Sequence, residues 1–204
     1  MTPDCRIIVF AKAPVPGQVK TRLAGAIGET RAARLASRML AETVWHAIEA
    51  GVGEVELCCA PDSTHADFVA LQARHALTLT VQGEGDLGAR MHRALAGALT
   101  QYKRVLLIGT DAPQLDASVL RAAAARLTTQ PVVFVPASDG GYVLVGLTRA
   151  MPALFEEIEW STPRVMAQSR ARLAASGISV DALPMLPDVD EPADLIHVPD
   201  DWWQ

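Results

Sequence analysis

The chain has 204 residues, half of them hydrophobic, and a net charge of −5. This length allows one domain with a sizeable core, and we expect residues 1–204 to form a single domain. An acidic chain lacks the basic excess of nucleic-acid-binding surfaces, which excludes nucleic acid as the default partner.

Strand-like and helix-like segments alternate along the chain. Hydrophobic patterns predict strands over 6–12, 54–60, 77–82, 104–110, 131–137, 142–148 and near 178–185. They predict helices over 29–50, 64–74, 86–101, 116–128, 151–158 and 163–175, with a short helix after 191. This alternation predicts an α/β fold, a mostly parallel sheet with helices on both faces. The Asp-Gly-Gly joint at 139–141 is typical of a hairpin, so one strand should be antiparallel.

Cellular context follows from what the sequence lacks. No stretch approaches the roughly 18 apolar residues of a membrane-spanning helix, and the N-terminus has no secretion-signal pattern. The three cysteines, Cys5, Cys58 and Cys59, have no metal-ligand spacing and fit a reducing environment. We therefore expect a cytoplasmic protein without a membrane span.

The segment after the first predicted strand carries a cluster of cations. Residues 13–23 contain two prolines and a glycine, which predict an open loop rather than a helix. Lys12, Lys20 and Arg22 lie on the strand end and this loop, where an α/β protein would hold a phosphate chain. A solvated basic loop is the alternative, and the loop alone does not decide between the two.

Asp111 is the strongest single candidate for a functional residue. It directly follows the apolar strand predicted at 104–110, and Pro113 then bends the chain away. The carboxyl tip of a central strand is where α/β sheets place ligands. We expect Asp111 to bind Mg²⁺ or Mn²⁺, because Mg²⁺ usually needs only one or two protein carboxylates beside substrate phosphates. The competing role of helix cap fits Asp116 better.

Two further acidic segments leave alternatives open. Asp188 and Asp190 alternate on an extended run and should face opposite ways, one toward the crevice and the other capping the last helix. By its position before Glu191 and Pro192, Asp190 favours the capping role. Asp139 is either a hairpin-turn residue or a carboxylate that faces an acceptor substrate.

A glycine-rich loop invites a different hypothesis. Gly83, Gly85 and Gly88 match the dinucleotide-binding pattern G-x-G-x-x-G between a predicted strand and a predicted helix. Two acidic residues in the loop would repel a pyrophosphate, and the strand at 77–82 alternates apolar residues with threonine rather than being fully apolar. The pattern therefore favours a loop that approaches a substrate or nucleotide closely, and it disfavours an NAD-dependent oxidoreductase.

The C-terminal tail contains adjacent tryptophans, Trp202 and Trp203. Such residues pack on a sheet edge or on a second copy of the chain. A homodimer is therefore left open as an alternative.

Five motifs occur together and in order. They are Phe10-Ala11-Lys12-Ala13-Pro14-x-x-Gly17-x-x-Lys20-Thr21-Arg22-Leu23, Gly85-Asp86-Leu87-Gly88-x-Arg90-Met91, Gly109-Thr110-Asp111-x-Pro113, Asp139-Gly140-Gly141-Tyr142 and Trp160-Ser161-Thr162. Over about residues 6–195 the chain resembles the bacterial GT-A family of radical-SAM/selenodomain-associated transferases, also described as arsenosugar-biosynthesis glycosyltransferase-like. The segment Lys20-Thr21-Arg22-Leu23 is also similar to phospholactate guanylyltransferases, and the ending Asp190-Glu191-Pro192-x-Asp194-Leu195 is similar to the closing motif of many sugar nucleotidyltransferases. The chain resembles molybdenum-cofactor nucleotidyltransferases more distantly.

The resemblance implies a three-layer αβα nucleotide-diphosphosugar transferase fold with a divalent metal at Asp111 and, from nucleotidyltransferase relatives, at Asp190. Catalytic candidates are Asp111, Lys20 and Asp139. Donor-binding candidates are Lys12, Pro14, Gly17, Lys20, Arg22, Gly85, Asp86, Leu87 and Gly88.

The implied activity is metal-dependent transfer from a nucleotide-activated donor to a small-molecule acceptor. Glycosyl transfer from a nucleotide sugar is preferred. Nucleotidyl transfer with release of pyrophosphate, or a catalytically silent nucleotide-binding protein, is the alternative. One departure bears on this choice: the chain has Thr110-Asp111-Ala112-Pro113 where many glycosyltransferases have an Asp-x-Asp pair.

Overall fold

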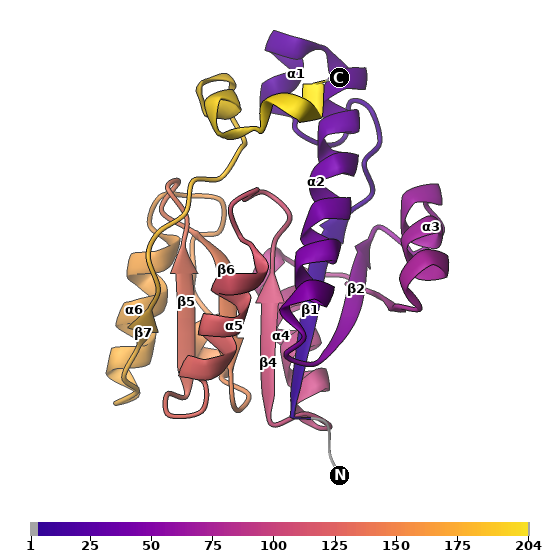
Figure 1. The fold of residues 1–204 in the computed structure, drawn as a ribbon. Helices are drawn as coiled ribbons and strands as arrows, with labels where there is room; N and C mark the ends of the chain where they lie inside the picture. The colour runs from indigo at the N-terminus through magenta and orange to yellow at the C-terminus, as the bar shows by residue number, and fades with distance from the viewer. Residues whose placement is uncertain (1–3, 204) are drawn as a thin grey trace.

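The structure, a computed structural model, describes residues 4–203 and is built on a seven-stranded sheet (Figure 1). In spatial order the strands are β3 (Thr78–Val81), β2 (Glu54–Ala60), β1 (Cys5–Lys12), β4 (Arg104–Ile108), β6 (Tyr142–Leu147), β5 (Val132–Pro136) and β7 (Asp181–Ala182). Strand β6 is antiparallel to β4 and β5, and the other pairings are parallel. The predicted mostly parallel sheet and its antiparallel strand are confirmed.

Helices cover both faces of this sheet, which gives the expected three layers. The helices are α1 (Thr21–Ile27), α2 (Glu29–Ala50), α3 (Ala66–His75), α4 (Leu87–Leu99), α5 (Ala117–Arg126) and α6 (Val165–Ala175), with short 3₁₀ turns η1 (Pro152–Leu154), η2 (Pro192–His197) and η3 (Asp200–Trp203). Helices α2, α3 and α5 contribute to one core cluster, and α4 and α6 to the other. Figure 1 shows α2 and α5 in front of the sheet.

The central strands are apolar on both sides because both sheet faces are covered. In β1, Ile7 and Ile8 are each fully buried, yet they belong to different core clusters. Successive side chains of a strand point to opposite faces, so a continuous apolar run serves both layers. Burial of each such side chain contributes about 1.5–3 kcal/mol.

The strand order places a topological switch point between β1 and β4. From β1 the chain builds outward through β2 and β3 on one side, and β4 pairs with β1 on the other, with Val9 opposite Ile108. Their carboxyl ends therefore lie side by side, and ligands of open α/β sheets bind at such a point.

The prediction of an open loop through residue 23 is wrong at its end. Helix α1 begins at Thr21, so Arg22 lies on a helix. The prolines lie several residues earlier and do not prevent it, and burial of Leu23 holds this short helix against its surroundings. Gly28, with φ of 83°, then separates α1 from α2.

Two other predicted elements are much shorter than the patterns indicated. The helix expected at 151–158 is the single turn η1, since Glu157 has a left-handed φ of 55° that a helix does not allow. The strand expected at 178–185 pairs regularly only at Asp181–Ala182. Pro184 follows closely and has no N–H to continue the ladder.

Within residues 4–203, none of the helices has the length and apolar character needed to cross a membrane.

Candidate functional site

A cleft of about 740 Å³ opens at the carboxyl ends of β1 and β4. Its lining includes these residues predicted from the sequence: Lys12, Lys20, Gly85, Leu87, Asp111 and Asp190. Among the described residues, other candidates lie off this lining: Pro14, Gly17, Arg22, Asp86, Gly88 and Asp139. The first loop, the tip of β4 and the C-terminal segment thus meet at one cavity.

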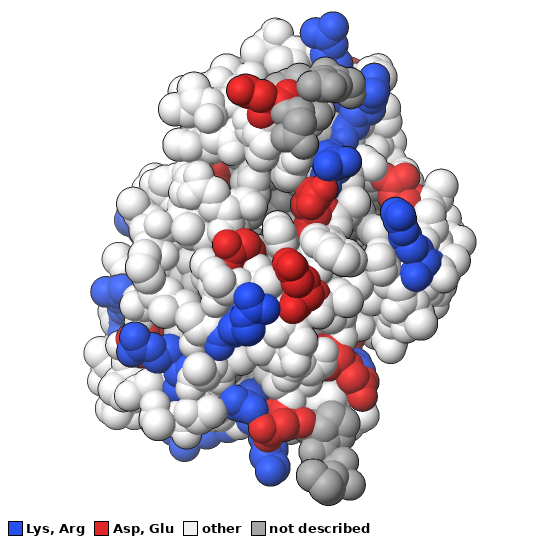
Figure 2. All heavy atoms as spheres, in the orientation of Figure 1, with Lys and Arg blue, Asp and Glu red and all other residues white. Residues whose placement is uncertain are grey.

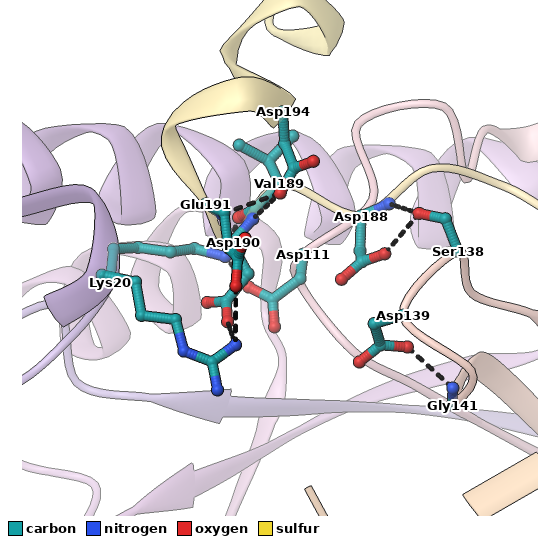
Figure 3. Close-up of polar contacts among 11 residues, drawn as sticks. Lys20, Asp111, Ser138, Asp139, Gly141, Asp188, Val189, Asp190, Glu191 and Asp194 are labelled. Carbon is teal, nitrogen blue, oxygen red and sulfur yellow. Dashed lines mark hydrogen bonds and ion pairs between the residues drawn. The ribbon is translucent and has the colours of Figure 1, made fainter. Parts of the chain in front are cut away.

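The centre of the site is an ion pair between Lys20 and Asp111 (Figure 3). The Lys20 Nζ donates to Asp111 Oδ1 and also to the Val189 carbonyl at 2.6 Å. The Val189 N–H in turn donates to the Asp111 carbonyl at 2.8 Å. The Lys20 side chain is 6% exposed, whereas that of Asp111 is 54% exposed toward the cleft. Three distant chain segments are therefore held together at this point.

The backbone of Lys20 is strained to make this contact. Its φ of 48° and ψ of 40° are left-handed, a conformation that costs a non-glycine residue about 1–3 kcal/mol. It stands at the N-terminal boundary of α1, and its side chain reaches Asp111 and Val189. The surrounding contacts offset the cost, as is common where a side chain is held for function.

A second ion pair lies at the rim. Arg22 Nη1 is 3.0 Å from Asp190 Oδ2 and 3.6 Å from Glu191 Oε1, and all three side chains are exposed. The capping role favoured for Asp190 is wrong. Glu191 is the N-cap of η2, in a capping box with Asp194, so the carboxylate of Asp190 is left to the cleft.

Asp188, for which two roles were left open, lies near Asp139 (Figure 3) but off the cleft lining. Its side chain is largely buried and accepts a hydrogen bond from Ser138 Oγ at 2.8 Å. The carboxylates of Asp188 and Asp139 lie on the same side of Asp111 (Figure 3). Asp188 and Asp190 face opposite ways, as their alternation predicts: Asp188 contacts Ser138, and Asp190 contacts Arg22.

The surroundings of Asp139 change the pKa of its carboxyl. Partial burial raises the pKa of its carboxyl, and the charges of Asp188, Asp190 and Asp111 raise it further. A hydrogen bond from the Gly141 N–H, at 2.7 Å, opposes the shift. This bond is the turn role foreseen for Asp139, and Figure 3 shows its carboxylate on the same side of Asp111 as that of Asp188.

The remaining candidates of the first loop lie around these pairs. Lys12 Nζ donates to the Gln18 carbonyl at 2.8 Å, and both residues line the cleft. Pro14 is buried, and Gly17 has a φ of 75° beside the Glu29 carboxylate. Gly17 thus forms the turn that returns the chain to Lys20.

The glycine-rich loop is anchored by its own helix. Asp86 caps α4 by accepting from the Ala89 N–H at 2.8 Å, so its carboxylate is engaged in structure. A Cβ on Gly88 would lie 2.5 Å from Trp160 Nε1, so the absence of a side chain here leaves room for the indole ring. The loop also follows β3, an edge strand, rather than a strand at the switch point. These features argue against dinucleotide binding.

Two further residues of the cleft wall were not singled out as candidates. Gln82 is buried, donates to the carbonyls of Ala11 and Cys58, and accepts from Arg90 Nη1 at 2.8 Å. The two residues line the same cleft. A glutamine at the end of a strand does not stand out in the sequence. Its burial depends on β1, β2 and β3 coming together, which a local pattern does not reveal.

On the face of the molecule that Figure 2 shows, charges of both signs are interspersed. The cleft lining likewise combines cations with carboxylates: Lys12, Lys20 and Arg90 with Glu84, Asp111 and Asp190. Within residues 4–203, no three His, Cys, Asp or Glu side chains already converge as a metal site. A cation at Asp111 would take its other ligands from substrate and water, the usual arrangement for Mg²⁺.

The C-terminal tail packs elsewhere than on the sheet edge. Trp202 packs on a small cluster of α1, α2 and the tail, with the Arg38 guanidinium 5.6 Å from its ring centroid. The side chain of Trp203 lies outside the described part of the structure.

Comparison with known proteins defines the class. The fold is α/β with a seven-stranded mixed sheet, shared with nucleotidyltransferases and GT-A-like proteins. The chain belongs to the DUF2064 family, described as uncharacterized protein conserved in bacteria, whose profile matches residues 43–162. No curated protein sequence matches the chain.

Solved structures extend this likeness over nearly the whole chain. A protein of Desulfovibrio desulfuricans G20, provisionally named a nucleotide-diphospho-sugar transferase, is 28% identical with a TM-score of 0.86, over 94% of this chain and 84% of that chain. The CMP:2-keto-3-deoxy-manno-octonic acid synthetase in complex with CTP is 14% identical with a TM-score of 0.60, over 96% of each chain. Rv0371C of Mycobacterium tuberculosis H37Rv, in complex with manganese, is 18% identical with a TM-score of 0.59, over 96% of this chain and 97% of that one. At these two lower identities the likeness concerns the fold alone.

Proposed function

We propose that the protein is a metal-dependent transferase that uses a nucleotide-activated donor, preferably a nucleotide sugar. The convergence of Lys20 and Asp111 in one cleft at the switch point carries this proposal. A cation able to hold phosphate and a carboxylate able to hold a divalent ion are the two groups that a metal–polyphosphate ligand needs.

Each charged residue has a distinct role in this proposal. Lys12, Lys20 and Arg22 hold phosphate oxygens through charge-assisted hydrogen bonds. Asp111 and Asp190 hold Mg²⁺ or Mn²⁺, since carboxylate oxygens suit these hard cations. Burial is the main cause of the raised pKa of Asp139, and the charges of Asp188, Asp190 and Asp111, which a cation would relieve, add to it. The metal, when bound, would neutralise charge that develops on the leaving phosphate.

The two walls of the site suggest separate substrates. Residues 82–85, Leu87 and Arg90 line the cleft that would take the nucleoside. Asp139 lies on the far side of Asp111 and would face the acceptor (Figure 3). In the glycosyl version the nucleoside diphosphate leaves the sugar as the acceptor attacks.

Nucleotidyl transfer is the second candidate. In that reaction a substrate phosphate attacks the α-phosphate and pyrophosphate leaves. The three cations near one cleft suit a triphosphate, and the sequence has Thr110-Asp111 instead of an Asp-x-Asp pair. The name of the Desulfovibrio protein supports the sugar donor instead.

A donor panel tests the proposal. The protein is incubated with nucleotide sugars and nucleoside triphosphates, Mg²⁺ or Mn²⁺ and candidate acceptors, and released nucleoside diphosphate and pyrophosphate are measured. Release of diphosphate supports glycosyl transfer and release of pyrophosphate supports nucleotidyl transfer, and Asp111→Asn should abolish either. Asp181→Asn, on β7 at the sheet edge, is the control and should retain activity. Tight metal-dependent nucleotide binding without release from any donor would favour the silent binding protein.

A further inference from the structure

The charged residues of the site are arranged as two matched pairs. Lys20 contacts Asp111, and Arg22 contacts Asp190. In each pair the cation is the residue proposed for phosphate and the carboxylate is the one proposed for metal. The partners come from segments far apart in sequence, so the pairing is a feature of the assembled site.

Pairing leaves each half of the site unsuited to an isolated ligand ion. A divalent cation on Asp111 alone would lie beside the Lys20 ammonium and be repelled by it. A phosphate chain on Lys20 alone would lie beside the carboxylates of Asp111 and Asp190. Arrival of both together lets each cation take a phosphate oxygen and each carboxylate face the metal, so no like charges remain in contact.

We propose that metal and polyphosphate enter this site by ion-pair exchange, so that the site takes the two together and resists either one alone. This inference rests on the proposed function, and it adds that Lys20 is a resident counter-ion of Asp111 as well as a phosphate ligand. The coupling is reciprocal, since each ligand must raise the affinity for the other by the same factor.

The Lys20–Asp111 pair should contribute more to the exchange than the Arg22–Asp190 pair, because the Lys20 side chain is buried. The Lys20 side chain is 6% exposed, so water does little to screen it from a neighbouring metal. Its second acceptor, the Val189 carbonyl, is neutral and can stay in contact when Asp111 turns to a cation. The Arg22–Asp190 pair is 61% and 42% exposed, so solvent weakens its contribution.

Lys12 provides an internal contrast. Its Nζ donates to the Gln18 carbonyl, a neutral partner, on the same cleft. A phosphate can therefore engage Lys12 without competing with a metal-binding carboxylate. Loss of Lys12 should weaken phosphate binding to a similar degree with and without metal, whereas loss of Lys20 should change the coupling.

Calorimetry with the separate ions tests the exchange on the full chain. We expect Lys20→Met to bind Mn²⁺ alone about fivefold or more tightly than the parent, and Asp111→Asn to bind pyrophosphate alone, in EDTA, more tightly by a similar factor. Both variants should lose binding of pyrophosphate in the presence of Mn²⁺. Lys12→Met should change Mn²⁺ affinity by less than about twofold, and so should Lys103→Met and Asp4→Asn, which alter the remote Lys103–Asp4 pair.

The outcomes separate this inference from the proposed function. If the parent binds pyrophosphate only with Mn²⁺ but neither Lys20→Met nor Asp111→Asn gains affinity for its single ion, the exchange is overturned and the transferase proposal stands. If the parent binds neither pyrophosphate nor any nucleotide with Mn²⁺, both fall. The two reciprocal variants guard against misfolding of one, and a thermal melt close to that of the parent verifies each.

Discussion

The C-terminal segment reaches the site through a small cluster of its own, and Leu23→Ala tests that arrangement. Leu23 on α1 is fully buried among side chains of α2 and of the tail, including Val189 and Val198, both buried. Val189 is the residue whose backbone groups contact Asp111 and Lys20. Truncation of Leu23 should therefore release the tail from the site before it unfolds the sheet.

The size of the effect follows from the burial. Leu→Ala at a fully buried position costs about 2–5 kcal/mol, and a small cluster that can relax belongs at the lower end. At about 2 kcal/mol, local opening of the tail rises roughly 30-fold. Hydrogen exchange of the peptide that contains the Val189 amide should accelerate accordingly.

Leu173→Ala is the matched control for this experiment. Leu173 on α6 is 1% exposed, and it belongs to the core cluster shared with α4 rather than to the cluster of Leu23. It should lower global stability by a similar amount without a selective effect on the tail. If exchange at residues 186–198 is no faster in Leu23→Ala than in Leu173→Ala, the tail is not held by this cluster.

Two further variants make separate predictions. Gly88→Ala would place a Cβ 2.5 Å from Trp160 Nε1 and should lower the free energy of unfolding by about 1–3 kcal/mol. Gly97→Ala on the same helix meets nothing within 4 Å and should raise it by up to about 1 kcal/mol. Equal denaturation midpoints for the two variants would contradict this. The raised pKa of Asp139 means that the folded state holds the carboxyl proton more tightly than the unfolded chain does. The contribution of this group to stability is therefore complete at acidic pH and is lost as pH rises through the raised pKa. Asp139→Asn should therefore gain stability over the parent at pH 7 relative to pH 3 in urea melts, and an unchanged difference at the two pH values would refute the assignment.

Much of the sheet could be predicted because its signals are local. The apolar runs of β1 and β4 are buried on both faces, and Asp111 follows the second run directly. Given alternating strands and helices, general rules for α/β sheets bring these strand ends together. The Asp116 cap was equally accessible, since it depends only on the two N–H groups that follow it.

What escaped prediction depends on contacts between distant segments. Asp190 looks like a cap by its neighbours, but Glu191 takes that role and Asp190 meets Arg22 instead. Gly88 looks like part of a phosphate-binding loop, yet Trp160 occupies the space above it. Such contacts are set by the packed fold, and a local pattern does not encode them.

The Lys20–Asp111 cleft should bind a metal–nucleotide complex. A crystal structure of the protein soaked with Mn²⁺ and a nucleotide that binds in calorimetry tests this, with anomalous scattering used to locate the metal. We expect a manganese peak at the Asp111 carboxylate, with Lys20 turned to a phosphate oxygen. A manganese–nucleotide complex bound elsewhere, with the Lys20–Asp111 pair intact, would contradict it.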